Sequence, residues 1–271
     1  MTPDQLAIHT FTTKPWSIDE CIENYARHGF GGISIWRETV EGEDLPRVSR
    51  KLKDSGLTPV SYVRGGFFTG TTTEARQRAI DTNLQYIRDS EALGLPMIVL
   101  VCGATPGQSP KENLSQIQDS IAAILPAAES AGIKLAIEPL HPMYAGDRCA
   151  VATMADANDL CEAINHPLLG VAADVYHIWW DSNLEREVAR CSAADRLFAF
   201  HVCDFKADLE HPLLDRELPG QGLGTCARVN DLVKDAGFTG LTEVEIFSRK
   251  YWSENQHQFL DKIKAACAPL R

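Results

Sequence analysis

The sequence Val171-Ala172-Ala173-Asp174-Val175-Tyr176-His177 is an apolar run of strand character that ends in an acid, with a histidine three residues later. Three other strand-like segments in the second half of the chain end in Glu138, His201 and Glu245. The four positions are 36, 27 and 44 residues apart, each about one strand, one helix and two loops. At equivalent ends of parallel strands these side chains would converge on one point. Three carboxylates and one imidazole suit a divalent cation with mixed oxygen and nitrogen ligands.

A short motif recurs along the chain, in which a helix end is followed by a glycine, an apolar residue and a strand. Its glycines are Gly29, Gly56, Gly94, Gly132 and Gly237. Glycine adopts the left-handed conformation that ends many helices, and the apolar residue after it packs back on the helix. The five copies therefore predict five helix-to-strand junctions.

Strand and helix patterns alternate along the whole chain. The predicted strands are 6–9, 32–36, 59–64, 97–102, 134–138, 170–174, 199–201 and 241–246. The predicted helices are 18–28, 44–55, 74–93, 111–131, 154–164, 183–194, 225–236 and 254–267. Such alternation indicates a parallel sheet with right-handed crossovers. Eight regular units favour a closed (βα)8 TIM barrel over a doubly wound sheet, and no linker divides residues 1–271, so we expect one domain.

The composition limits the possible partners. The net charge of −11 disfavours nucleic acid and anionic membranes, because both are bound by clustered Lys and Arg. The eight cysteines form no C-x-x-C pair, which is typical of reduced thiols. The start of the chain resembles no targeting peptide, and no apolar run approaches the ~20 residues that span a bilayer. We therefore expect a cytoplasmic protein that acts on a small molecule.

The four convergent residues predict a particular chemistry. A hard cation binds a sugar carbonyl and its neighbouring hydroxyl, and stabilises the enediolate that forms when the α-carbon loses a proton. Glu138 and Glu245 suit the removal and return of that proton, whereas Asp174 and His201 would be mainly ligands. A single imidazole among carboxylates favours Mn²⁺, with Mg²⁺ or Co²⁺ as alternatives, over a structural zinc.

Other polar residues fall at the same predicted strand ends, where barrel enzymes carry their active sites. His9, Trp36 and Arg64 end early strands and are candidates for substrate binding. Trp36 could equally be a core residue, and Arg64 could hold an anionic group or form a salt bridge. His141 is a candidate second acid or base, or an ordinary loop histidine. The irregular stretch 204–224 follows the seventh strand and is expected to cover the site, unless it is a plain surface excursion.

Four motifs carry a family resemblance. They are Ile137-Glu138-Pro139, Asp174-Val175-Tyr176-His177, His201-Val202-Cys203-Asp204 and Glu243-Val244-Glu245-Ile246-Phe247. With them, nearly the whole chain resembles the xylose isomerase-like superfamily of barrels, which includes sugar isomerases and epimerases, inosose dehydratases and AP-endonuclease-type nucleases.

The resemblance implies roles for particular residues. In the ketose 3-epimerases of this superfamily, two Glu, one Asp and one His bind the metal and the two Glu exchange the proton; by position these are Glu138, Asp174, His201 and Glu245. The residue that matches His177 contacts substrate oxygens. These epimerases also carry an arginine shortly after the ligand histidine, where the nearest basic residue in this chain is Lys206. The turn Pro219-Gly220-Gln221-Gly222 looks like the family's P-G-D-G turn, with Gln221 in place of the acid.

The alternatives are separated by their site residues. The nuclease branch needs further histidines on early strands and an Asp-x-His after the seventh, where this chain has Arg64, Cys102 and no such motif. A metal-dependent sugar isomerase or epimerase is the leading hypothesis. A dehydratase or lyase that eliminates a β-leaving group from a keto-sugar or keto-glycoside is the nearest rival, and a non-catalytic sugar-binding barrel is the third. By analogy with related barrels, the chain is a possible homo-oligomer.

Overall fold

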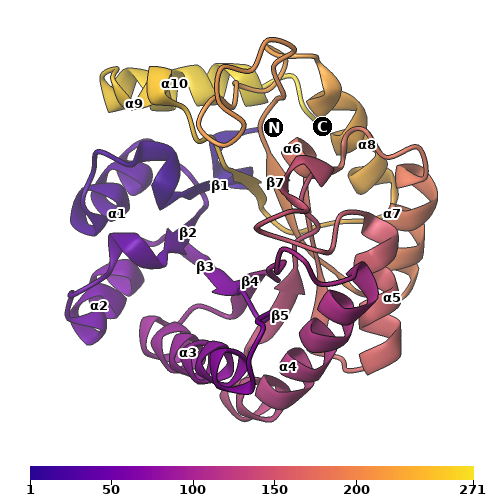
Figure 1. Cartoon of the computed structure of the whole chain (residues 1–271). Helices are drawn as coiled ribbons and strands as arrows, with labels where there is room; N and C mark the ends of the chain where they lie inside the picture. Colours follow the sequence, from indigo (N-terminus) through magenta and orange to yellow (C-terminus); the bar gives the residue numbers. More distant parts are fainter.

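The structure, a computed structural model, describes residues 1–271 and contains a closed barrel of eight parallel strands in chain order. Figure 1 shows the strands at the centre with the helices around them. The strands are β1 (Leu6–His9), β2 (Gly32–Trp36), β3 (Thr58–Gly66), β4 (Met97–Val101), β5 (Lys134–Ile137), β6 (Leu169–Asp174), β7 (Leu197–Val202) and β8 (Thr242–Val244). The predicted (βα)8 barrel is therefore confirmed.

Each strand is followed by at least one helix on the outside of the barrel. The helices are α1 (Ile18–Arg27), α2 (Leu45–Ser55), α3 (Thr73–Leu93), α4 (Pro110–Ala131), α5 (Met154–Ile164), α6 (Val175–Ile178), α7 (Leu184–Ala193), α8 (Thr225–Asp235), α9 (Arg249–Trp252) and α10 (Gln256–Cys267). The sequence patterns missed α6 and α9, because four residues are too few to show a helical period.

The five predicted junction glycines all adopt the left-handed backbone conformation. Their φ angles lie between 67° and 97°, a region that costs other residues energy. Gly56, Gly94 and Gly132 directly follow the last residues of α2, α3 and α4. These glycines end the three helices and turn the chain towards the next strand.

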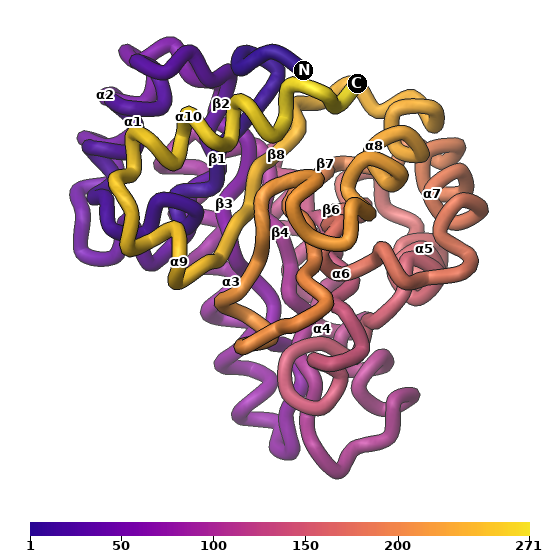
Figure 2. The backbone as a smooth tube through the Cα atoms, turned by 90° about the horizontal axis from the view of Figure 1, so that it is seen from above, coloured from indigo at the N-terminus to yellow at the C-terminus, as the bar shows by residue number.

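The barrel closes where β1 pairs with β8, with Leu6 opposite Thr242. The two ends of the chain consequently lie side by side, as Figure 2 shows from above. The Met1 amino group donates to the carbonyl of Ala268 at 3.1 Å, which fastens the N-terminus to the segment after α10.

The inside of the barrel is lined in part by three alanines, Ala136 on β5, Ala172 on β6 and Ala199 on β7. Side chains two residues apart on a strand point to the same face. Glu138, Asp174 and His201 stand two positions after these alanines and therefore point into the same interior. Because alanine side chains are small, the space above them is free for Glu138, Asp174 and His201.

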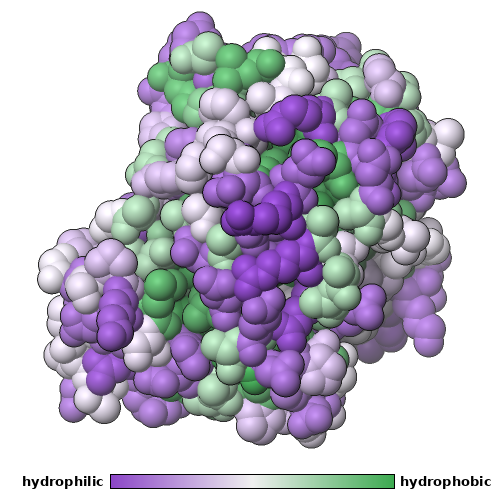
Figure 3. All heavy atoms as spheres, turned by 90° about the vertical axis from the view of Figure 1, so that its right-hand side faces the viewer, coloured by the Kyte–Doolittle hydropathy of each residue, from purple (hydrophilic) through white to green (hydrophobic).

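The outer surface is largely polar. Figure 3 views the face over α5 and α7, where hydrophilic residues dominate and apolar ones gather only in small patches. On this face Arg190 of α7 pairs with Asp159 and Glu162 of α5 at 2.8 and 2.6 Å. None of the helices combines the length and apolar character needed to cross a bilayer. All eight cysteines are buried and unpaired.

Candidate metal centre and active site

Glu138, Asp174, His201 and Glu245 come together at the C-terminal end of the barrel. Each offers a ligand atom, and the four atoms lie within 4.8 Å of one another. The adjacent strands fix this arrangement, since Asp174 stands directly opposite His201 in the β6–β7 register. His201 Nδ1 lies 3.0 Å from Glu138 Oε1. All four side chains are buried, so their position is set by the barrel and not by mobile loops.

Arg216 is the counter-charge to this acidic cluster. Its Nη1 donates to Asp174 Oδ2 at 2.9 Å and to Glu245 Oε2 at 2.7 Å. Its Nη2 lies 3.2 Å from His177 Nε2. The guanidinium, only 2 % exposed, is packed over the rings of Tyr176 and Phe247.

Arg216 replaces Lys206 as the basic residue of the site. Lys206, which the resemblance made a candidate substrate contact, instead pairs with Asp215 at 3.0 Å. Arg216 lies ten residues further along the irregular stretch 204–224, where no periodic pattern indicates which side chains turn inward. That stretch is fastened by an Asp204–Glu217 bridge and an Asp215–Ser248 bridge, which together direct Arg216 into the barrel.

The charges of the cluster shift one another's protonation. Burial raises the pKa of Asp174 to about 7, against the opposing effect of Arg216. Burial also raises the pKa of Glu245, but the positive charges of Arg216 and His9 outweigh it and hold that pKa well below its usual range. Burial lowers the pKa of His201, but the neighbouring carboxylates outweigh this effect and raise that pKa to about 10. In the cluster, positively charged side chains therefore offset part of the negative charge of the carboxylates.

A fourth carboxylate lies beneath the cluster. Glu243 precedes Glu245 by two residues and points to the same interior, where it is 1 % exposed. Its Oε1 lies 3.7 Å from His201 Nε2 and its Oε2 lies 3.2 Å from His9 Nε2. Ser34 and Ser61 donate to Oε2 at 2.5 and 3.1 Å. Alternation along β8 was the signal that could have identified Glu243 in the sequence.

His9 belongs to this buried layer and not to the substrate cavity. It is fully buried, with Nδ1 3.1 Å from Glu245 Oε1 and 3.1 Å from Trp36 Nε1. His9, a predicted substrate residue, is therefore not among the residues that line the cavity, because it ends β1 on the inside, below the acidic cluster. It supports Glu245 from the side opposite Arg216.

A cavity of about 110 Å³ opens above the cluster. Of the predicted residues, Glu138, Glu245, His177, Trp36 and Arg64 line it. The other lining residues are Phe11, Glu38, Val101, Leu140, Tyr144, Arg148, Leu213, Arg216 and Phe247. One wall is thus aromatic and the opposite end acidic.

His141, the proposed second acid or base, lies beside this cavity and not in its wall. Its ring stacks on Phe205 with centroids 5.5 Å apart, and on Trp179 at 6.4 Å. Burial lowers its pKa. Its backbone N–H donates to His177 Nδ1 at 3.2 Å, so the residue's visible role is to orient the ring of His177.

The donor set fits a divalent cation. Glu138, Asp174 and Glu245 supply three carboxylates and His201 one imidazole, all buried and aimed at one point. With the three acids ionised and His201 neutral, as ligands of a metal must be, the guanidinium of Arg216 leaves a net charge of −2, which a dication balances. Oxygen-rich sets with one imidazole suit Mn²⁺, Mg²⁺ and related ions. The cluster is therefore a candidate divalent metal centre.

Comparison with known proteins defines the class. Residues 22–264 match the sequence model of the xylose isomerase-like TIM barrel, and the chain belongs to this family. Inosose isomerase of Bacillus licheniformis is 22 % identical over 260 residues, which cover 90 % of this chain and 88 % of that protein.

Solved structures agree with this assignment. Protein SMc04130 from Sinorhizobium meliloti is 35 % identical, with a TM-score of 0.93 over 97 % of each chain. The IOLI protein, whose structure contains a bound zinc atom, is 21 % identical, with a TM-score of 0.86 over 99 % of this chain and 97 % of that one. The predicted superfamily is confirmed.

Proposed function

We propose that the chain is a divalent-metal-dependent sugar isomerase or epimerase that moves a proton at the carbon beside a carbonyl. The observation that carries this proposal is the pair Glu138 and Glu245, which reach one cavity from β5 and β8 and share one cluster with Asp174 and His201. The relatives named inosose isomerase support the same type of reaction, and a small keto-sugar or keto-cyclitol is the substrate class that follows.

The four clustered residues would hold the metal, and we favour Mn²⁺, with Mg²⁺ or Co²⁺ as alternatives. The zinc atom in the IOLI structure makes zinc a further candidate to be tested. When bound, the cation supplies Lewis acidity that polarises the substrate carbonyl and acidifies the neighbouring C–H.

The proton is moved by the protein's own carboxylates. One of Glu138 and Glu245 takes the proton from the α-carbon, and the same or the other carboxylate returns it to a carbon of the resulting enediolate. Arg216 and His9 hold Glu245 ionised, which keeps it ready to accept a proton. Return to the opposite face of the same carbon gives an epimer, whereas return to the neighbouring carbon gives an isomer.

The other lining residues hold the substrate. Burial lowers the pKa of His177 well below its usual range, and Arg216 lowers it further, so the ring is neutral and can exchange hydrogen bonds with a sugar hydroxyl. Trp36, Phe11 and Phe247 form an aromatic wall that excludes water and packs against the carbon skeleton.

Solvent exchange tests this proposal. The metal-loaded enzyme in D₂O should place deuterium on the carbon next to the carbonyl of a ketose or inosose, and Glu245→Gln should reduce the rate by at least about a thousandfold with the metal retained. Release of water or an aglycone would assign the chain to the dehydratases or lyases. Equal exchange by wild type and Glu245→Gln would remove the proposed base.

The remaining expectations concern the surroundings of the enzyme. Eight unpaired, buried cysteines fit a reducing compartment, so we expect it to work in the cytoplasm. Its acidic net charge gives no basis for nucleic acid or membrane partners. Barrels commonly associate through their helices, and a homo-oligomer is a possibility for sedimentation analysis to test.

A further inference from the structure

The wall of the substrate cavity contains two arginines whose hydrogen-bond donors are uncommitted. Arg64 lies near the end of β3, and Arg148 lies in the loop after β5. Neither guanidinium donates a hydrogen bond within the chain. The nearest carboxylate of Arg64 is Glu38 at 3.9 Å, and that of Arg148 is its neighbour Asp147 at 3.7 Å. Both distances are too long for a hydrogen bond.

Two other arginines of comparable or deeper burial are paired with carboxylates at hydrogen-bond distance, although Arg216 Nε has no partner. Arg190, 32 % exposed, donates to three carboxylates at 2.6 to 3.1 Å. Arg216 donates to two carboxylates at 2.9 and 2.7 Å. Arg64 is only 20 % exposed and Arg148 33 %, yet they have no such partner. Because both arginines line the cavity, a ligand bound there would supply the hydrogen-bond acceptors that the chain does not.

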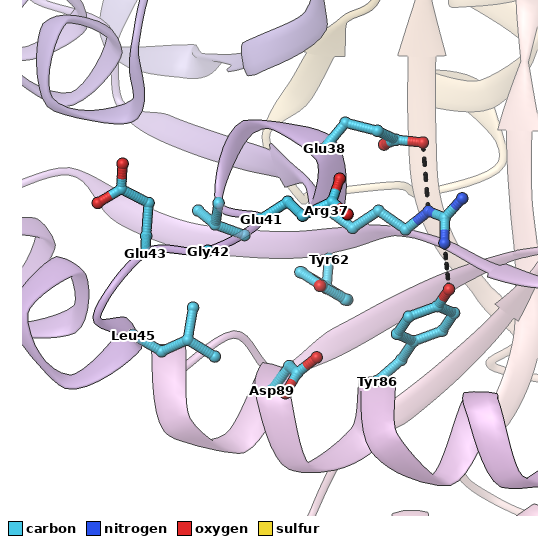
Figure 4. A pocket seen from close by; sticks show the side chains of 10 residues that line it. Arg37, Glu38, Glu41, Gly42, Glu43, Leu45, Tyr62, Tyr86 and Asp89 are labelled. Atoms are coloured by element: carbon cyan, nitrogen blue, oxygen red, sulfur yellow. Dashed lines mark hydrogen bonds and ion pairs between the residues drawn. The ribbon is translucent and has the colours of Figure 1, made fainter.

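Glu38 does not fill this role, although it also lines the cavity. Figure 4 shows that its carboxylate is directed to Arg37, whose Nε donates to Glu38 Oε1 at 3.2 Å. The guanidinium of Arg37 also contacts the Tyr86 hydroxyl in the same view. Glu38 Oε1 is therefore hydrogen-bonded to Arg37 and lies farther, at 3.9 Å, from Arg64, whose N–H donors it does not accept.

The packing of Arg64 leaves its N–H edge available. Its guanidinium lies over the rings of Phe67 and Trp36, 4.8 and 5.7 Å from their centroids. Aromatic faces cover the plane of a guanidinium but do not use its in-plane donors. Burial lowers the pKa of Arg64, the carboxylate of Glu38 raises it in part, and the positive charges of Arg37 and Arg148 lower it further, which places Arg148 within electrostatic reach. A negatively charged ligand group would relieve this repulsion.

We infer that the substrate carries an anionic group, a carboxylate or a phosphate, which Arg64 and Arg148 bind while the carbonyl end faces Glu138 and Glu245. The inference rests on the proposed function for the identity of the reacting end. It narrows the substrate class from sugars in general to sugar acids or sugar phosphates. Bidentate guanidinium contacts are the usual mode of recognition for both anions.

Binding to the manganese-loaded enzyme tests the inference without requiring turnover. The probes are D-fructose, D-fructose 6-phosphate and 5-keto-D-gluconate, which share a ketone and differ in charge, and calorimetry measures their affinities. We expect at least one anionic probe to bind about 10- to 100-fold more tightly than D-fructose. In Arg64→Gln and Arg148→Gln this preference should fall about 3- to 10-fold for each substitution, with D-fructose affinity changed less than about threefold.

The two anionic probes distinguish a phosphate site from a carboxylate site. Arg50→Gln, a charge-matched change at an exposed position of α2, is the control and should retain the full preference. The inference is overturned if D-fructose binds as tightly as both anionic probes, if neither anionic probe binds at about 10 mM, or if the Arg64→Gln Arg148→Gln double variant keeps the preference. Failure of the proposed function is a separate result, since it is read from deuterium exchange and Glu245→Gln.

Discussion

Replacement of Asp204 should release the turn at residues 220–225, which follows Arg216 in the irregular stretch. Asp204 is fully buried directly after β7. Its Oδ2 accepts the backbone N–H groups of Gly220, Gly222 and Gly224 at 3.0, 3.3 and 3.0 Å. Its Oδ1 accepts the N–H and the hydroxyl of Thr225 at 3.3 and 3.1 Å. One carboxylate thus organises the whole turn that precedes α8.

The size of the effect follows from these contacts. A hydrogen bond to a charged group contributes about 1.5–3 kcal/mol, and an orphaned buried N–H costs a similar amount. Water can reach part of a surface turn, so we expect Asp204→Ala to lower the free energy of unfolding by about 4 kcal/mol. Asp204→Asn keeps one acceptor oxygen but points an amide N–H at backbone donors, and about 2–3 kcal/mol should be lost.

Urea unfolding followed by circular dichroism measures both variants. Asp208→Asn is the matched control, because Asp208 is exposed four residues further on, and its effect should stay within about 0.5 kcal/mol. If Asp204→Ala unfolds within about 1 kcal/mol of the wild type, the carboxylate does not hold the turn and this account of the turn before α8 is refuted.

Three further changes test other parts of the molecule. Glu243→Gln should lower Mn²⁺ affinity about 10- to 100-fold in calorimetry with the circular dichroism spectrum unchanged, because it removes the carboxylate that lies beside Nε2 of the ligand His201. Unchanged affinity would show that Glu243 does not support His201 as a ligand. Arg216→Met should destabilise the metal-free protein by about 3–5 kcal/mol, since two buried carboxylates lose their cation. Mn²⁺ should then raise the melting temperature of this variant more than that of the wild type. Equal stability of the two metal-free proteins would show that Arg216 does not compensate the buried carboxylates. Burial raises the pKa of Glu187, but hydrogen bonds from Asn158 and neighbouring arginines outweigh it and lower that pKa, so its contribution to stability is present at neutral pH and is lost as the pH falls through the lowered value. The difference in unfolding free energy between wild type and Glu187→Gln should therefore be largest near pH 7 and shrink below about pH 4, and a difference that grows in acid would reverse the assignment.

The barrel could be predicted from the sequence because its junctions are marked locally. A glycine that must adopt positive φ ends a helix whatever the rest of the chain does, and Gly56, Gly94 and Gly132 did so at the predicted positions. The cluster of Glu138 and its three partners followed from the same regularity, since strand ends of a parallel barrel meet at one edge. Period-2 alternation then made these side chains point inward.

The residues that the sequence did not reveal depend on contacts across the barrel. Arg216 comes from an irregular stretch whose path is set by Asp204 and by bridges to distant segments. His9 ends its strand like the true cavity residues, but its depth in the barrel places it under Glu245. Local patterns report which face a side chain takes, whereas its height along the barrel axis depends on strand stagger, which only the folded structure gives.

The position of the bound cation tests the central claim most directly. An anomalous difference map from crystals of the protein loaded with Mn²⁺ should show one strong peak about 2.0–2.3 Å from a ligand atom of each of Glu138, Asp174, His201 and Glu245. A peak elsewhere, or no peak at this cluster under saturating Mn²⁺, would contradict the proposal that these four residues form the catalytic metal centre.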